Sequence, residues 1–263
     1  MEPLVPSTGW GVLHLFYRVD APRAEREPGG AKRVLDAIAS LDADGHQVLC
    51  AAVLGHKADL AVMALGPDVA RLQQFQRDLR DAPLDLVWSY VSLTELSEYT
   101  STEDDERARL IREEQLAGDE LETRLAEFRD RMAHYAEHRL HPQLPRKRLL
   151  CFYPMSKRRE EGANWYELPF AERKHLMSDH ARVGRRYAGR ILQLITGSTG
   201  IDDWEWGVTL LADDPVALKD IVNEMRFDPV SARYAEFGPF VTGLLLEPVD
   251  ALARAGLADG DAS

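Results

Sequence analysis

The strongest constraint on the fold of this 263-residue chain is an order of predicted strands and helices that occurs twice. The first occurrence, within residues 1–97, alternates apolar runs such as GWGVLHLFYRV with segments that carry apolar residues at helical spacing, such as AKRVLDAIASL. The order is strand, helix, strand, strand, helix, strand, which is that of a ferredoxin-like unit. Its predicted strands span 9–19, 46–55, 58–66 and 84–93, and its predicted helices span 31–41 and 67–79.

Residues 148–250 are predicted to repeat this order, although their residues hardly match those of the first unit. Pro154 removes a backbone donor, so we expect strand pairing to stop there and Met155, Ser156 and Lys157 to begin a loop. Two such units can pack face to face or share a sheet edge. The chain is therefore expected to be an α+β protein of tandem ferredoxin-like modules. The predicted strands of the second unit span 147–155, 190–198, 203–212 and 239–248, and its predicted helices span 171–189 and 214–227.

The segment between the two units, residues 98–147, differs from both. It is highly charged and carries Leu, Ile and Phe at helical intervals. We expect one or two amphipathic helices that connect the modules, with most of their surface in solvent. The last residues, 251–263, follow the final predicted strand and are expected to form a disordered tail.

The composition argues against several kinds of partner. With 32 Lys and Arg against 44 Asp and Glu, the net charge is -12, whereas nucleic acids and anionic membranes attract basic surfaces. No apolar run reaches the roughly 20 residues of a membrane span, and MEPLVPSTGW does not resemble a signal peptide. Cys50 and Cys151 lie in apolar runs without metal-binding spacing, so we expect two small core residues. These features favour a cytoplasmic protein.

Residues that could carry chemistry are concentrated in the second module. Each also has an ordinary explanation, because a helical His is more often a packed or surface residue than a ligand and a strand Tyr is usually a core ring. Gln193, inside the apolar run RILQLI, must find partners if it is buried, or else it faces a cavity. Spacing alone supports only an anion-binding pocket with a His that could bind a metal. The candidates are Tyr153, Lys157, His180, Gln193, Arg226 and Ser231.

Longer strings from this module resemble a known family. YPMSKRR, NWYELPFAERKHLMSDHARVGRRYAG, QLITGSTGIDDWEWGVTLLADDP and EMRFDPVSARYAEFGPFVTG are similar, in this order, to the coproheme decarboxylases, which were once grouped as chlorite-dismutase-like proteins. A looser similarity covers VLGHKADLAVMALG and SYVSLTELSEY in the first module. The resemblance implies two ferredoxin-like modules per subunit, of the dimeric α+β barrel type, and assembly into homopentamers.

The resemblance also implies an activity. Such an enzyme converts iron-coproporphyrin III, called coproheme, into haem b by turning two of four propionates into vinyl groups, through a three-propionate intermediate. Each loss of CO₂ removes two electrons, so an oxidant is needed, and the family uses hydrogen peroxide. The porphyrin is then substrate and redox cofactor at once. The ferrochelatase that produces coproheme is the partner that this activity suggests.

Individual residues acquire roles from the same resemblance. His180 matches the proximal ligand of the haem iron, Tyr153 the tyrosine that becomes a radical and attacks the propionate, and Lys157 the lysine beside that propionate. Gln193 matches the distal-side glutamine of one branch, at a position where oxygen-evolving chlorite dismutases carry an arginine. Met155 matches a residue that lines the porphyrin edge, and the matches to propionate contacts are Arg139, Arg226 and Ser231.

Several alternatives remain open on the sequence. Another branch of the family uses a distal His, and His134, His138 or His141 of the connector could take that place. Chlorite dismutation or a general peroxidase activity is a second interpretation, and Gln193 in place of Arg argues against chlorite dismutation. A non-catalytic haem-binding or haem-delivery protein would need neither Tyr153 nor Lys157. A small-ligand regulator would usually carry a DNA-binding segment, and no basic helix-turn-helix is evident. The fold alone does not separate these functions.

Overall fold

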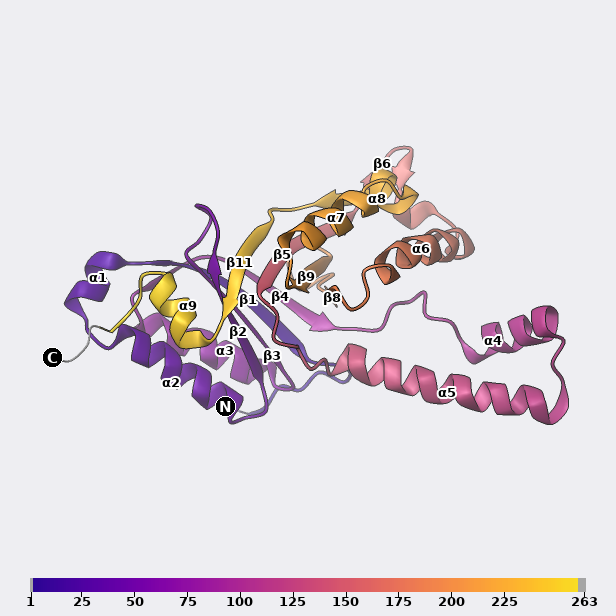
Figure 1. Cartoon of the computed structure of the whole chain (residues 1–263), viewed down its shortest axis with the longest axis horizontal. Helices are drawn as coiled ribbons and strands as arrows, with labels where there is room; N and C mark the ends of the chain where they lie inside the picture. The colour runs from indigo at the N-terminus through magenta and orange to yellow at the C-terminus, as the bar shows by residue number, and fades with distance from the viewer. Residues whose placement is uncertain (1, 260–263) are drawn as a thin grey trace.

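The structure is a computed structural model that describes residues 2–259, and it joins the strands of both modules into one continuous sheet (Figure 1). The spatial order is β4-β1-β3-β2 in the first module and β11-β5-β9-β8 in the second, which is the same arrangement twice. The expected α+β class with tandem ferredoxin-like modules is therefore confirmed. The strands are β1 (Gly11–Val19), β2 (Gln47–Val53), β3 (Leu60–Gly66), β4 (Leu84–Thr94), β5 (Leu149–Lys157), β8 (Ile191–Gly197), β9 (Trp206–Ala212) and β11 (Val241–Leu246).

The two modules share both of their sheet edges. β2 pairs antiparallel with β11, and β4 pairs antiparallel with β8 through Leu93 and Thr94. Of the two packings that the repeat allowed, the shared edge is thus the one adopted. Because each edge strand of one module finds a partner in the other, the strands close into a barrel, which protects edges that would otherwise invite pairing with another chain.

Side chains along each strand alternate between the inside and the outside of this barrel, as the two-residue period of a strand requires. On β1, Val12 and Phe16 belong to an inner cluster, whereas Leu13 and Leu15 belong to an outer one. Phe152 of β5 is fully buried in the inner cluster. The interior is therefore a packed core, and ligands must be sought on the outside.

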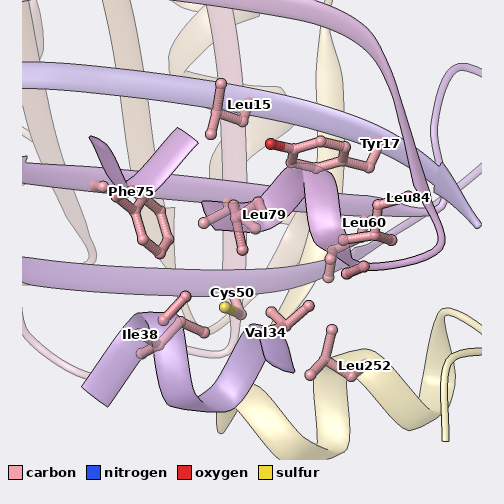
Figure 2. Close-up of a cluster of buried hydrophobic side chains, with 14 of the residues drawn as sticks. Leu15, Tyr17, Val34, Ile38, Cys50, Leu60, Phe75, Leu79, Leu84 and Leu252 are labelled. Carbon is pink, nitrogen blue, oxygen red and sulfur yellow. The ribbon is translucent and has the colours of Figure 1, made fainter. Parts of the chain in front are cut away.

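The outer face of the first module is covered by three helices, α2 (Gly30–Asp42), α3 (Val69–Asp78) and α9 (Pro248–Arg254). Figure 2 shows Val34 and Leu252 beside Cys50 in the core between these helices and the sheet. Cys50 and Cys151 are both buried free thiols, as the sequence predicted. This side of the molecule is closed by its own hydrophobic core.

The outer face of the second module is covered less completely. Its helices are α6 (Phe170–Arg185), α7 (Pro215–Met225) and α8 (Pro229–Tyr234), while β10 (Ala235–Phe237) pairs with the end of β5. The connector forms α4 (Glu103–Arg109), a π-helical turn (Leu110–Glu114) and the long α5 (Gly118–Leu140), which extends away from the barrel in Figure 1. The smaller elements are α1 (Ala21–Arg26), the hairpin β6 (Arg159–Glu160) and β7 (Ala163–Asn164), and single 3-10 turns at Leu79–Asp81 and Trp165–Glu167. No helix among residues 2–259 combines the length and apolarity needed to cross a membrane.

The expectation that β5 would end at Pro154 is wrong. The strand continues to Lys157, because Pro154 stands opposite Gly207 of β9 at a position where no ladder bond from its nitrogen is needed. Its carbonyl accepts the N–H of Gly238, so the side of Pro154 that lacks a donor faces the link between β10 and β11. Proline is tolerated in a strand at such positions.

The expectation of a disordered tail from residue 251 is also wrong for the part that the structure describes. Pro248 starts α9, whose Ala251 and Leu252 are fully buried, and Leu257 packs in the same cluster. The segment is ordered because its apolar side chains complete the core of the first module. Residues 260–263 lie outside the described residues.

Replacement of Leu252 tests this role of the C-terminal helix. Leu252→Ala should lower the free energy of unfolding by about 2–5 kcal/mol, because it removes buried methyl groups and leaves a cavity. The control Val249→Ala lies on the same helix but is 57% exposed, and its effect should stay within about 0.5 kcal/mol. Urea denaturation measures both changes. Equal and small effects would mean that α9 is not part of the folded core.

Candidate active site

A large cavity lies between the outer face of the second module's sheet and the helices α6, α7 and α8. Its volume is about 340 Å³, and it opens in part to solvent. Sites for organic ligands measure roughly 300–1,000 Å³, so the cavity has the size of such a site. The segment after β4, residues 95–99, forms a further part of its lining.

The sheet wall of the cavity follows from the two-residue period of its strands. Tyr153, Met155 and Lys157 occupy alternate positions of β5, so all three face outward. Antiparallel pairing places Val208 opposite Tyr153 and Trp206 opposite Met155. The neighbouring strand β8 adds Gln193 and Ile195 at alternate positions. The polar amide of Gln193 thus faces a cavity, which is one of the two environments that its position in an apolar strand allowed.

The helical wall contributes His180 of α6. Nδ1 of His180 lies 2.9 Å from Oδ2 of Asp228, and this contact fixes the ring while leaving Nε2 available. Asp228 is the N-cap of α8, and its Oδ1 accepts the backbone N–H groups of Val230 and Ser231. Burial alone would raise the pKa of Asp228, but the hydrogen bonds with His180 and Ser231 outweigh burial and lower it. An ionised carboxylate therefore orients the imidazole, which is how proteins prepare a His to bind a metal.

Lys157 is a buried cation at the cavity wall. Its side chain is mostly removed from water, and this burial lowers its pKa to about 8, although the negative charges of Asp228 and Glu205 oppose the shift. Nζ lies 4.4 Å from the centre of the Trp165 ring. An ammonium in this position is suited to bind an anionic group of a ligand.

Tyr153 presents a neutral phenol to the same space. Its ring stacks on Phe240 with 4.3 Å between centres and meets the edge of Phe237 at 5.9 Å. Burial raises the pKa of Tyr153, an effect strengthened by Cys151 and opposed by Arg226. The phenol therefore keeps its proton at neutral pH. A protonated phenol can give up an electron and a proton together, whereas a phenylalanine ring cannot.

Arg139 and Glu95 form a polar group at another part of the lining. Nη2 of Arg139 lies 3.3 Å from the carbonyl of Ile195, and its buried Nε has no partner among the described residues. Oε1 of Glu95 accepts the indole N–H of Trp206 at 3.0 Å. Burial raises the pKa of Glu95, against the effects of Trp206 and Arg139. Arg139 therefore brings a positive charge to the lining of the cavity, where it can attract a ligand carboxylate.

The structure brings most of the predicted site residues to one place. Arg226 is the exception, because it is exposed at the C-terminal end of α7 and does not line the cavity, although its guanidinium lies 5.5 Å from the ring of Phe237. None of the three connector histidines, all within the described residues, lines this cavity. Of these, His134 and His138 contact each other on the exposed surface of α5. The predicted residues that line the cavity are Arg139, Tyr153, Met155, Lys157, His180, Gln193 and Ser231.

Four further residues of the site were not singled out from the sequence. Asp228 had a usable signal, since an Asp before Pro at a helix start is a common N-cap. Trp206 and Glu95 had none, because they meet across 111 residues of chain. Trp165 had none either, because its contact with Lys157 depends on the course of the turn between them.

Comparison with known proteins shows which family the sequence is related to. A family model described as chlorite dismutase matches residues 29–246. The coproheme decarboxylase of Staphylococcus carnosus is 41% identical over 252 residues, which cover 90% of this chain and 92% of that protein. A Natronomonas pharaonis protein named for haem binding is also 41% identical, over 261 residues that cover 94% of this chain. The match spans only 41% of the length of that archaeal relative.

Solved structures agree with this relationship. A protein from Thermus thermophilus, described as heme-binding, has a TM-score of 0.76 at 36% identity, over 97% of this chain and 100% of that one. A mutant chlorite dismutase from Candidatus Nitrospira defluvii has a TM-score of 0.66 at 14% identity, over 95% and 97% of the two chains, and at that identity it supports the fold alone. Because the family model and the Staphylococcus relative both cover most of the sequence, the chain belongs to the chlorite dismutase family.

Proposed function

We propose that this chain is a coproheme decarboxylase, which uses hydrogen peroxide to convert iron-coproporphyrin III into haem b through a three-propionate intermediate. The observation that carries the proposal is a neutral phenol and a buried ammonium, Tyr153 and Lys157, on one strand face of a cavity whose opposite wall holds His180. The name and 41% identity of the Staphylococcus carnosus relative support the choice of substrate. Chlorite dismutation is less well supported, since Gln193 supplies no positive charge on the sheet wall.

The residues of the cavity fit an iron porphyrin with several carboxylates. His180 would ligate the iron through Nε2, because Asp228 already engages Nδ1. Apolar side chains from both walls would cover the macrocycle, and Met155 lies where it would contact the porphyrin edge. Arg139 and Ser231, which both line the cavity, would hold propionates. Arg226 would reach a propionate only at the rim, because it lies outside the lining.

Tyr153 and Lys157 would act on the propionates that react. Lys157 would hold a carboxylate by a charge-assisted hydrogen bond and keep its carbon chain beside the phenol. Bound at His180, the porphyrin would supply the redox chemistry, in which peroxide is the terminal oxidant. The phenol of Tyr153 would lose an electron and a proton, and the resulting tyrosyl radical would take hydrogen from the propionate β-carbon. Gln193 would contact small ligands that approach from the sheet side.

The balance of the reaction sets the amount of oxidant. Conversion of one propionate into a vinyl group releases one CO₂, two electrons and one proton when the carboxylate starts ionised. One hydrogen peroxide takes up two electrons and two protons and becomes two waters. Two propionates therefore consume two molecules of peroxide. A buried phenol suits this chemistry because it is protonated before each turnover and is regenerated in that form when the radical takes up a hydrogen.

The proposal extends to the compartment, the partners and the oligomeric state of the enzyme. Free thiols at Cys50 and Cys151 fit a reducing, cytoplasmic compartment. The net charge of -12 disfavours nucleic acid as a partner. We further infer, from the resemblance to the family, a homopentamer that receives coproheme from a coproporphyrin ferrochelatase.

Replacement of His180 tests iron ligation. His180→Ala should change the Soret spectrum of bound coproheme, because the iron loses its protein ligand. The matched control is His175→Ala, on the same helix, whose side chain is exposed and pairs with Asp179. Optical titration of both variants with coproheme measures the effect. An unchanged spectrum in His180→Ala would remove His180 from the iron.

Replacement of Tyr153 tests the radical. Tyr153→Phe keeps the ring and its stacking on Phe240, so coproheme should still bind and peroxide should still be consumed. No three-propionate product and no haem b should form, because the O–H that must be oxidised is gone. Tyr17→Phe, a buried tyrosine of the first module's core, is the control and should retain activity. Haem b formation by Tyr153→Phe at a near-normal rate, followed by chromatography and mass spectrometry, would contradict the radical role.

A further inference from the structure

We propose that Trp165 is a positioning residue that holds the ammonium of Lys157, by a cation–π contact, at the place where a substrate carboxylate meets it. The inference rests on the proposed function, since it concerns how the lysine of that site is kept ready. Trp165 follows the β6–β7 hairpin in a 3-10 turn, eight residues after Lys157. Nothing in the spacing of the two residues predicts their contact.

The contact has the geometry of a strong cation–π interaction. Nζ of Lys157 lies 4.4 Å from the centre of the indole ring, within the ~6 Å that such interactions require. Trp165 is 2% exposed and Lys157 is 8% exposed, so water competes little with the ring. Among aromatic side chains, the indole of Trp attracts a cation most strongly, and the attraction increases when the pair is removed from water.

The carboxylates near Lys157 are already occupied by other donors. Glu205 accepts the backbone N–H of Lys157 at 2.7 Å, and it also accepts Arg159 and the hydroxyl of Tyr166. Asp228 is engaged by His180 and by the start of α8. These acids attract the ammonium through space, but their hydrogen bonds are directed elsewhere. The aromatic face therefore provides the direct contact of the ammonium.

The position of Trp165 is itself fixed. Its backbone N–H donates to the carbonyl of Arg158 at 3.0 Å, which closes the hairpin beside Lys157. Its ring packs against Tyr234, with 5.4 Å between centres, and against Val230 of α8. Glu205 holds both the backbone of Lys157 and the side chain of Tyr166, the residue after Trp165. The ring is thus a rigid platform for a flexible side chain.

A π face suits this task better than a carboxylate would. A neighbouring carboxylate would form an ion pair with Lys157, and a substrate propionate would have to displace it. An aromatic ring attracts the ammonium without neutralising its charge or accepting its N–H groups in the way a carboxylate does. N–H donors therefore remain for the ligand. Loss of the Trp165 ring should therefore weaken the binding only of ligands that bring a carboxylate to Lys157.

A double-mutant cycle with two porphyrins tests the proposal. Trp165→Leu, Lys157→Met and the double variant are titrated with coproheme and with deuterohaem, which carries hydrogen in place of the two propionates that react. Each single variant should bind coproheme about 2- to 30-fold more weakly than the wild type. The double variant should be no weaker than Lys157→Met, because Trp165 acts through that lysine. All four proteins should bind deuterohaem equally.

Three further kinds of variant separate positioning from packing. Trp165→Phe keeps an aromatic face and should restore part of the affinity lost in Trp165→Leu, while Trp88→Phe, a tryptophan packed in the barrel core, should bind coproheme as the wild type does. Fluorinated tryptophan at position 165 keeps the shape but weakens the π face, and affinity should fall with each added fluorine. This last variant also serves if Trp165→Leu does not fold.

Additive losses in the cycle, an equal loss for deuterohaem, or no effect of fluorination would overturn the proposal and leave Trp165 a packing residue. The proposed function fails in a different way. In that case the wild type would bind coproheme yet release no CO₂ with peroxide, while the cycle would still report whether Trp165 and Lys157 are coupled.

Discussion

The arrangement of the site depends on the closure of two four-stranded sheets into one barrel. Antiparallel pairing of β2 with β11 and of β4 with β8 joins the modules at both edges. Closure commits every strand to one inward and one outward set of side chains. The inward set of both modules is used up in a packed core, so each module has only its outer face left for helices or ligands. In the first module three helices fill that face, and in the second the cavity remains.

The acidic and the basic residues around the cavity have different roles. The two acidic residues have structural roles. Asp228 caps α8 and orients His180, and Glu205 holds the segment around Lys157. The cations Lys157 and Arg139 both line the cavity and are not tied up by these two carboxylates. An acidic protein can in this way bind an acidic ligand, because the local charges of a buried site matter more than the net charge of -12.

The repeat of strands and helices was predictable because it rests on local periodicity. The family resemblance selected Tyr153 and His180, and both line the cavity of the second module. Pairing partners were not predictable, which is why β5 was expected to end at Pro154 although its missing donor lies where none is needed. The order of α9 was missed for a similar reason, since Leu252 is buried by residues from the other end of the chain. The contact of Lys157 with Trp165 likewise depends on a turn that no local pattern specifies.

As the proposed coproheme decarboxylase, the protein would oxidise two propionates of a porphyrin bound in this cavity. The most direct measurement loads the purified protein with coproheme, adds hydrogen peroxide in steps, and determines the mass of the porphyrin after each step. We expect a three-propionate species after the first equivalent and haem b after the second, with two CO₂ released in total. Consumption of peroxide with all four propionates retained, or with destruction of the macrocycle and no vinyl product, would contradict it.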